Sequence, residues 1–291
     1  MRRALALGCG GTLGFAWSVG ALRAVERDLG WDARTAEIVV GTSAGAELAV
    51  LLGSGYSVAD VLAALEGSPS DQLLADHLTR SPARFPPLPG LGWPAAGLTA
   101  RALRGRVDVT AGLAGLLPRG RGNATWLRDL GERLATPEGW VRHPATWLVA
   151  AHARTGHRVA FGSPGAPRLP LGEALAASWA VPGWFPPVRG YLDGGTISSV
   201  SADLLLDRGV DEVVVIAPMT SQTPAPATGA ARLERVLRRR MTRGLDREVA
   251  RLWAAGIRVR RVEPTPADLA AMGPNFMDVR RRAATTRRVR A

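Results

Sequence analysis

The 291-residue sequence contains no lysine and only one cysteine, Cys9. A single cysteine cannot form an intrachain disulfide, and it cannot build a metal site from several thiolates. The absence of lysine excludes a serine–lysine catalytic pair. Because free thiols persist in reducing compartments, the cysteine content favours a cytoplasmic protein.

Long apolar runs are also missing, since no uninterrupted stretch approaches the roughly 18 residues that cross a bilayer. Arg2 and Arg3 precede a short apolar run, as in a secretory signal, but glycines interrupt that run from Gly8 onward. We therefore expect residues 3–8 to form a first core strand. The hydrophobic content of 46% is enough for a large core, and the length allows one large domain or two small ones. Because strands and helices alternate along the chain, we expect a single domain over residues 1–291.

Positive charge is in clear excess, at +12, and all of it is carried by arginine. An arginine-rich tail occupies residues 278–291. One explanation of the arginine content is a GC-rich genome. Another is that the positive charge draws the protein to an anionic membrane surface or to nucleic acid, and composition does not distinguish these explanations. Because no nucleic-acid-binding motif accompanies the charge, no specific nucleic acid is expected as a partner.

A serine turn follows the second apolar run of the chain. Residues 37–40 form a short predicted strand, a Gly-x-Ser-x-Gly motif spans residues 41–45, and a helix-like stretch follows. This is the pattern of a nucleophile elbow, a turn so sharp that small residues must flank the serine. Ser43 is therefore the candidate nucleophile, with Gly41 and Gly45 as supporting residues. Taken alone, the motif is equally compatible with a catalytic elbow and with a glycine-rich turn whose serine has no catalytic role.

A glycine-rich loop occupies residues 8–14, between the first expected strand and a helix predicted over residues 15–29. A dinucleotide-binding loop does not fit, because Leu13 stands where the last glycine of that fingerprint belongs. The alternative is an oxyanion site, in which backbone N–H groups stabilise negative charge on a reacting carbonyl oxygen. Its expected donors are the N–H groups of Gly10, Gly11 and Thr12, with Gly14 as a supporting glycine.

A serine nucleophile needs a proton acceptor, and the sequence offers two kinds. The four histidines all precede Asp193, so the order serine, acid, histidine requires an early pair such as Asp71 or Asp76 with His77. The other kind is a carboxylate acting without histidine. Asp193 ends a short apolar approach and precedes Gly194, which places its carboxylate on a turn. A serine–aspartate dyad with Asp193 as the base is the more economical prediction.

Strands and helices alternate along the chain, which predicts an α/β fold, and residues 211–217 give the strongest signal of a buried parallel strand. Residues 67–122 interrupt this alternation with proline, glycine and large apolar residues, and an apolar helix is expected over residues 98–117. The insertion is a candidate cap that moves as a lid or faces lipid, or it is a surface excursion that packs its own tryptophan. A flexible linker is expected over residues 221–229.

Three blocks together resemble the patatin-like phospholipase family: the loop at residues 10–14, the elbow at residues 41–45, and Asp193 followed by two glycines. Residues 180–188 also look like that family's approach to its aspartate. The resemblance implies a three-layer α/β/α fold with a mostly parallel central sheet, here with an inserted Pro/Gly-rich cap. It also implies a Ser–Asp dyad that hydrolyses acyl esters of lipids without a metal or another cofactor. One departure is Leu13, where family members commonly carry arginine or lysine.

The sequence therefore predicts a serine acyl hydrolase of phospholipase A, lysophospholipase or lipase type, whose partner is a lipid or another acyl ester. The alternative is a lipid-binding or protein-binding member of the same family with weak or no catalysis. Leu13 favours that alternative, whereas the presence of both Ser43 and Asp193 opposes it. The expected location is the cytoplasm, with peripheral contact with an anionic membrane surface as an extension of that prediction.

Overall fold

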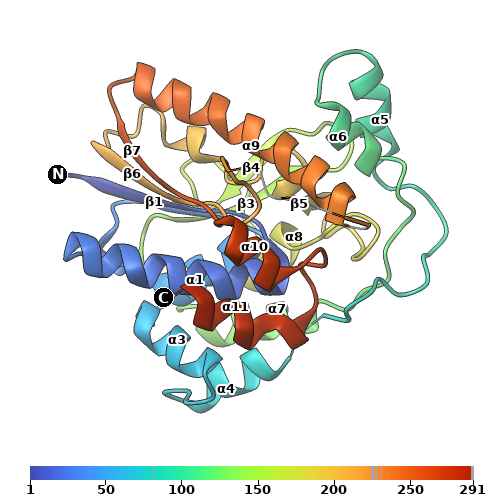
Figure 1. Cartoon of the computed structure of the whole chain (residues 1–291). Coiled ribbons are helices and arrows are strands. Elements are labelled where there is room, and N and C mark those ends of the chain that lie inside the picture. Colours follow the sequence, from blue (N-terminus) through green and yellow to red (C-terminus); the bar gives the residue numbers. More distant parts are fainter. Residues whose placement is uncertain (81, 224–225, 227, 230, 290–291) are drawn as a thin grey trace.

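The computed structural model describes residues 1–80, 82–223, 226, 228–229 and 231–289. Part of the linker expected over residues 221–229 lies outside these residues. In the described part of the chain, the strands form one seven-stranded sheet with the order β4-β3-β2-β1-β6-β7, and β5 pairs with β3 beside that path. Helices cover both faces of this sheet (Figure 1).

Most strands of the sheet run parallel to one another. In sheet order, the parallel strands are β3 (Thr146–His152), β2 (Val39–Thr42), β1 (Arg3–Leu7), β6 (Glu212–Ile216) and β7 (Arg258–Val262). The two others, β4 (Arg158–Phe161) and β5 (Tyr191–Asp193), are antiparallel to β3. Because the carboxyl ends of parallel strands meet at the same edge of a sheet, the loops after β1, β2 and β6 gather at one edge.

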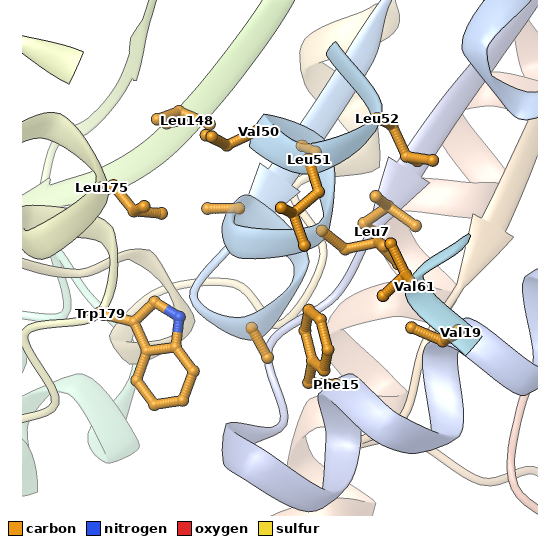
Figure 2. Close-up of a cluster of buried hydrophobic side chains, with 14 of the residues drawn as sticks. Leu7, Phe15, Val19, Val50, Leu51, Leu52, Val61, Leu148, Leu175 and Trp179 are labelled. Carbon is orange, nitrogen blue, oxygen red and sulfur yellow. The ribbon is translucent and has the colours of Figure 1, made fainter. Parts of the chain in front are cut away.

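Successive side chains of β1 enter two different apolar clusters, one on each face of the sheet. Leu5 and Leu7 belong to the larger cluster, part of which is shown in Figure 2, whereas Ala4 and Ala6 belong to the other. A sheet buried on both faces explains why its strands read as unbroken apolar runs. The mostly parallel sheet between two helical layers confirms the predicted three-layer α/β/α fold.

The two helical layers differ in size. The smaller layer contains the long helix α9 (Ala231–Ala254) and the 3₁₀ turn Ala202–Leu205. The larger layer contains α1 (Gly11–Leu29), α2 (Ala44–Gly53), α3 (Val58–Leu65), α4 (Gln72–Thr79), α7 (Thr125–Leu134), α8 (Leu171–Ser178) and α10 (Pro266–Met272).

Two helix predictions need correction. Helix α1 begins at Gly11 rather than at residue 15, because Gly11 has a φ of 59° and lets the chain turn directly from the loop into the helix. The single helix expected over residues 98–117 is wrong. The chain instead forms α5 (Ala96–Leu103) and α6 (Val109–Ala114), and Gly105 breaks the run between them with a φ of 65°.

The segment predicted as an insertion, residues 67–122, has two parts. Its first part contains α4, whose Leu74 and Leu78 side chains are buried in the main core. The second part, residues 82–122, contains α5 and α6, which pack against each other and stand apart from the helices that cover the sheet (Figure 1). We call residues 82–122 the cap.

The arginine-rich end of the chain includes helix α11 (Arg282–Val289), which packs against α1. Thr285 and Thr286 are buried there, and the Arg282 guanidinium donates a hydrogen bond of 2.8 Å to the carbonyl oxygen of Leu78. This part of the basic segment is therefore docked on the protein. None of the helices in the described ranges combines the length and the apolar character that a membrane crossing requires.

The close packing of α2 on β1 gives a stability prediction for Gly45. A Cβ atom at this position would lie 2.2 Å from the carbonyl oxygen of Leu7, which is a backbone atom and cannot turn aside. We expect Gly45→Ala to lower the free energy of unfolding by about 1–3 kcal/mol, as overpacking does. Urea unfolding followed by circular dichroism measures the change.

Gly244 provides the matched control, because it is also helical but a Cβ atom added there would have no neighbouring atom within 4 Å. Gly244→Ala should leave stability unchanged or raise it, since alanine is the better helix former. Equal stability of Gly45→Ala and the wild type would contradict this account of the packing.

Candidate active site

The serine of the Gly-x-Ser-x-Gly motif lies in a sharp turn between β2 and α2. Ser43 has a φ of 56° and a ψ of −118°, a region that residues with a side chain rarely adopt. The turn also brings its two glycines together, because a Cβ on Gly41 would lie 2.4 Å from the carbonyl oxygen of Gly45. The local geometry is therefore that of a strained strand-to-helix elbow, and it requires glycine on both sides of the serine.

A second serine holds the elbow in place. The backbone N–H of Ser43 donates to the Ser178 hydroxyl at 2.9 Å, and that hydroxyl donates to the carbonyl oxygen of Val149 at 2.7 Å. Ser178 ends α8 and is completely buried. Its hydroxyl thus links the strained turn to β3, the strand beside β2.

Asp193 reaches the elbow because of the order of the strands. Thr42, the last residue of β2, pairs with Val149 of β3, and the next residue of β3, Ala150, pairs with Asp193 of β5. The Ser43 hydroxyl lies beside the carboxylate of Asp193, close enough for hydrogen bonding to lower the pKa of that carboxylate. The carboxylate also accepts a hydrogen bond from the backbone N–H of Gly195 at 2.7 Å. The structure therefore brings together the two side chains predicted as nucleophile and base.

The backbone packs tightly at Gly194, the residue that follows Asp193. A Cβ on Gly194 would lie 2.6 Å from the carbonyl oxygen of Val149, so this position accepts only glycine without a shift of the backbone. Gly194, predicted as a supporting residue, thus lets the chain turn away from β5 immediately after the carboxylate.

Burial controls the proton affinity of Asp193, whose side chain is almost inaccessible to solvent. Loss of hydration disfavours the charged carboxylate and raises its pKa to about 7, while the hydrogen bonds from Ser43 and Gly195 oppose the rise. A pKa near 7 means that the carboxylate is partly ionised at neutral pH and binds a proton more strongly than an aspartate in water. Such a group is suited to general base catalysis.

The glycine loop after β1 lies at the same edge of the sheet as the elbow, since Leu7 pairs with Gly41. Within the loop, the N–H groups of Gly8, Cys9, Leu13 and Gly14 donate to backbone carbonyl oxygens. The remaining N–H groups have no backbone acceptor among the described residues, and they belong to Gly10, Gly11 and Thr12, the three predicted donors. These groups also lie at the N-terminus of α1, where the helix dipole favours negative charge.

The loop is supported from behind by the segment after β6. Pro218 packs so closely that a Cβ on Gly10 would lie 2.9 Å from its ring, and a Cβ on Gly14 would lie 3.3 Å from it. The carbonyl oxygen of Pro218 in turn accepts a hydrogen bond of 2.6 Å from the buried guanidinium of Arg238, on α9. Arg238 is also ion-paired with Glu234. Leu13 is fully buried in the main core. The sequence position at which the resembled family commonly has arginine or lysine is therefore apolar in this protein.

The alternative histidine arrangements do not form. His77 is buried, and its Nε2 lies 2.8 Å from a carboxylate oxygen of Glu47. Asp71 instead accepts a hydrogen bond from the Tyr56 hydroxyl, and Asp76 accepts one from Gln72. Neither aspartate is hydrogen-bonded to His77, and the hydrogen bond of the Ser43 hydroxyl goes to Asp193.

Cys9 lies next to the site but is unsuited to act as a nucleophile. A Cβ atom added to Gly195 would lie 2.9 Å from the Cys9 Sγ. Gly195 is the residue whose N–H donates a hydrogen bond to Asp193. Burial, reinforced by the nearby Asp193, raises the pKa of the Cys9 thiol far above neutral pH. The thiol is therefore protonated and occupies space beside the dyad.

Two half-buried aromatic rings pack together beside the glycine loop. Ser43 is 2% exposed. The rings of Trp184 and Phe276 lie 6.3 Å apart, and Phe276 packs against Gly11 of the glycine loop. Trp184 belongs to the proline-rich approach to Asp193. The two rings thus connect the segments that carry the base and the expected oxyanion donors.

Sequence reasoning missed the residues that support the site from other elements, because they carry no motif. Ser178 lies just before residues 180–188, and this nearness to a recognised segment is the one signal that could have identified it. Arg238 is one of many arginines in α9, and nothing local distinguishes it. Among the described residues, no group of three or more His, Cys, Asp or Glu side chains is placed to hold a metal ion.

The bridging hydroxyl of Ser178 gives a second stability prediction. Ser178→Ala removes the acceptor of the Ser43 N–H and the donor to Val149, so two buried backbone groups lose their partner. We expect the free energy of unfolding to fall by about 1–3 kcal/mol in urea titrations. Ser18→Ala is the matched control, because the buried Ser18 hydroxyl has no partner among the described residues, and its loss should be neutral. An equal effect of both substitutions would refute the bridging role.

The chain matches a known protein family over most of its length. The family model described as patatin-like phospholipase matches residues 5–206, which is more than half of the chain and includes the glycine loop, the elbow and Asp193. A search of curated proteins gives no match. On the extent of the family match, this chain belongs to the patatin-like phospholipase family.

Proposed function

We propose that the protein is a serine acyl hydrolase that cleaves carboxylic ester bonds of lipids through Ser43 and Asp193. Membership of the patatin-like phospholipase family indicates a lipid acyl hydrolase in general terms. The observation that carries the specific proposal is the placement of the Ser43 hydroxyl beside a buried carboxylate whose pKa is raised to about 7. A hydroxyl held by a base of this strength is an activated nucleophile.

The first half of the proposed reaction transfers the acyl group to the enzyme. Ser43 Oγ attacks the carbonyl carbon of the ester while its proton passes to the Asp193 carboxylate. The carbonyl oxygen becomes negatively charged and accepts hydrogen bonds from backbone N–H groups of Gly10, Gly11 and Thr12. As the tetrahedral intermediate collapses, the C–O bond to the alcohol breaks, and the proton on Asp193 passes to the leaving oxygen.

The second half releases the acid. A water molecule attacks the acyl–Ser43 ester and gives one proton to Asp193, so that a second tetrahedral intermediate forms at the same backbone donors. Collapse of this intermediate breaks the bond to Ser43 Oγ and returns the proton to it. The products are a fatty acid and the free enzyme. In both halves of the reaction, the Asp193 carboxylate accepts the proton of the attacking group and returns it to the leaving oxygen.

Phospholipase A, lysophospholipase and lipase reactions all fit this scheme, because each cleaves an acyl ester at the carbonyl carbon. The family acts on lipid substrates. We also propose that the protein meets these substrates by peripheral contact with an anionic membrane surface, which its charge of +12 favours.

A second candidate function is a lipid-binding or partner-binding protein with little catalysis. The observations that favour it are the low exposure of Ser43, at 2%, and the apolar Leu13 in the glycine loop. A binding protein would retain lipid affinity when the dyad is removed, and it would show no dependence of ester hydrolysis on Ser43.

Substitution of the dyad separates these two functions. We expect Ser43→Ala and Asp193→Asn each to lower kcat by about a thousandfold or more, because the nucleophile and its base act as one unit. Fatty acid release from phospholipid–detergent micelles and hydrolysis of a short-chain p-nitrophenyl ester measure the loss. Ser54→Ala is the control, since the buried hydroxyl of Ser54 has no partner in the described part of the chain. Activity of either dyad variant at the level of this control would refute the proposed roles.

The pH dependence of activity follows from the raised pKa of Asp193. Only the ionised carboxylate accepts the Ser43 proton, so kcat/KM should rise with pH and reach half its plateau at about pH 7. Below that pH the carboxyl group holds a proton and the base is lost. The profile is measured with a soluble ester, with circular dichroism at each pH to exclude unfolding. A midpoint of about 4, the ordinary value of an aspartate, would contradict a buried base.

A further inference from the structure

The outer surface of the cap carries an unusual concentration of exposed apolar side chains. Most of the large apolar residues that are exposed in the described part of the chain lie between residues 85 and 117. Leu91 is 96% exposed and Leu103 is 86% exposed. We define the cap face by six of these residues, namely Phe85, Leu88, Leu91, Trp93, Leu103 and Leu113.

The exposure of the cap face is not caused by a lack of internal packing. Ala95 and Leu98 of the cap form a small buried cluster with Ala153 and Leu192, the residue just before Asp193. Ala111 of α6 is also fully buried. The cap therefore contains packed, buried residues, and it also leaves large apolar side chains exposed in the segment before α5 and in both of its helices.

The charges around the cap face are almost all positive. Arg104, Arg106, Arg119 and Arg121 are exposed and have no ion pair with any described residue. The single acidic residue between residues 82 and 122 is Asp108. Apolar side chains mixed with arginines are typical of surfaces that enter the boundary between headgroups and acyl chains of anionic membranes.

We propose that the cap face is the surface by which this protein docks on an anionic lipid bilayer. A second copy of the chain is a poorer occupant, because it would bring the unpaired arginines of two cap faces together. Nucleic acid is also a poorer occupant, because the exposed leucines of the cap face offer it no partner. A bilayer accepts both kinds of side chain at once, with leucine and tryptophan among the acyl chains and arginine at the phosphates.

The cap is joined directly to the aromatic pair beside the active site. At one end, the N–H of Gly122 donates to the carbonyl oxygen of Trp184 at 2.7 Å. At the other end, the side-chain amide of Asn275, which precedes Phe276, donates to the carbonyl oxygen of Arg84 at 3.0 Å. Both ends of the cap are thus hydrogen-bonded to the segments that carry these two rings, which would couple docking of the cap face to the neighbourhood of the proposed site. This link to catalysis rests on the proposed function, whereas docking itself does not.

Partition into vesicles tests the docking surface. The full chain carrying Ser43→Ala, which cannot consume the lipid, is mixed with sucrose-loaded vesicles of phosphatidylcholine with and without phosphatidylglycerol, and the bound fraction is measured after sedimentation. We expect binding to the anionic vesicles that weakens at high salt. Adding Leu88→Glu with Leu91→Glu should lower the partition coefficient at least about tenfold, because both side chains lose their place among the acyl chains.

Two pairs of controls make the test specific. Leu233→Glu with Val236→Glu makes the same change at exposed apolar residues of α9, outside the cap, and should not alter binding. Arg104→Glu with Arg106→Glu should abolish the preference for vesicles that contain phosphatidylglycerol. The control, Arg239→Glu with Arg240→Glu, changes the net charge by the same amount on α9, and this variant should retain the preference. Equal effects of the cap and α9 variants would overturn the proposal, and so would a wild-type cap that does not bind anionic vesicles.

Two further measurements distinguish the other outcomes. If Leu88→Glu with Leu91→Glu dissolves a dimer in analytical ultracentrifugation, the cap face is an interface between two copies, and the proposal is wrong. Hydrolysis of a soluble p-nitrophenyl ester by cap variants that retain Ser43 reports the proposed function separately. We expect this rate to match that of the wild type. Vesicle binding by a chain that hydrolyses no ester would refute the proposed function and leave the docking surface supported.

Discussion

The placement of the Ser43 hydroxyl beside the Asp193 carboxylate depends on every level of this structure. Strands β2 and β5 pair with the same edge of β3, because β4 occupies its other edge. The meeting of the two residues therefore requires β5 to pair with β3 directly beyond the end of β2, in the observed register. Burial then sets the chemistry, because the removal of water raises the pKa of Asp193 to about 7. The fold thus places a carboxylate of raised proton affinity beside the serine hydroxyl, as the proposed dyad requires.

Features that depend on local sequence could be predicted, and features that depend on tertiary contacts could not. The elbow at Ser43 and the buried strand β6 follow from short patterns, because a strained turn demands glycine and a sheet covered on both faces demands apolar runs. The bridging role of Ser178 and the support by Arg238 arise only when distant elements pack. The helix expected over residues 98–117 was wrong because its apolar spacing continues across Gly105, where the backbone adopts a positive φ.

The glycine loop shows how a site can be supported from outside its own motif. Leu13 contributes to the core, and the buried cation near the loop is instead Arg238, which reaches Pro218 from α9 and is neutralised by Glu234. Pro218 in turn packs on Gly10 and Gly14 and holds the loop in position. The loop is thus supported without a cation at position 13, so Leu13 by itself does not decide between catalysis and a purely binding role.

Covalent labelling with a fluorophosphonate, followed by mass-spectrometric mapping of the adduct, tests the central claim most directly. The reagent reacts with an activated serine and needs no knowledge of the lipid headgroup. With the wild type in detergent micelles, we predict an adduct on the peptide that contains Ser43, no adduct in Ser43→Ala, and strongly slowed labelling in Asp193→Asn. An adduct on another residue, equal rates for Asp193→Asn and the wild type, or no labelling of the folded wild type would contradict a Ser43–Asp193 dyad.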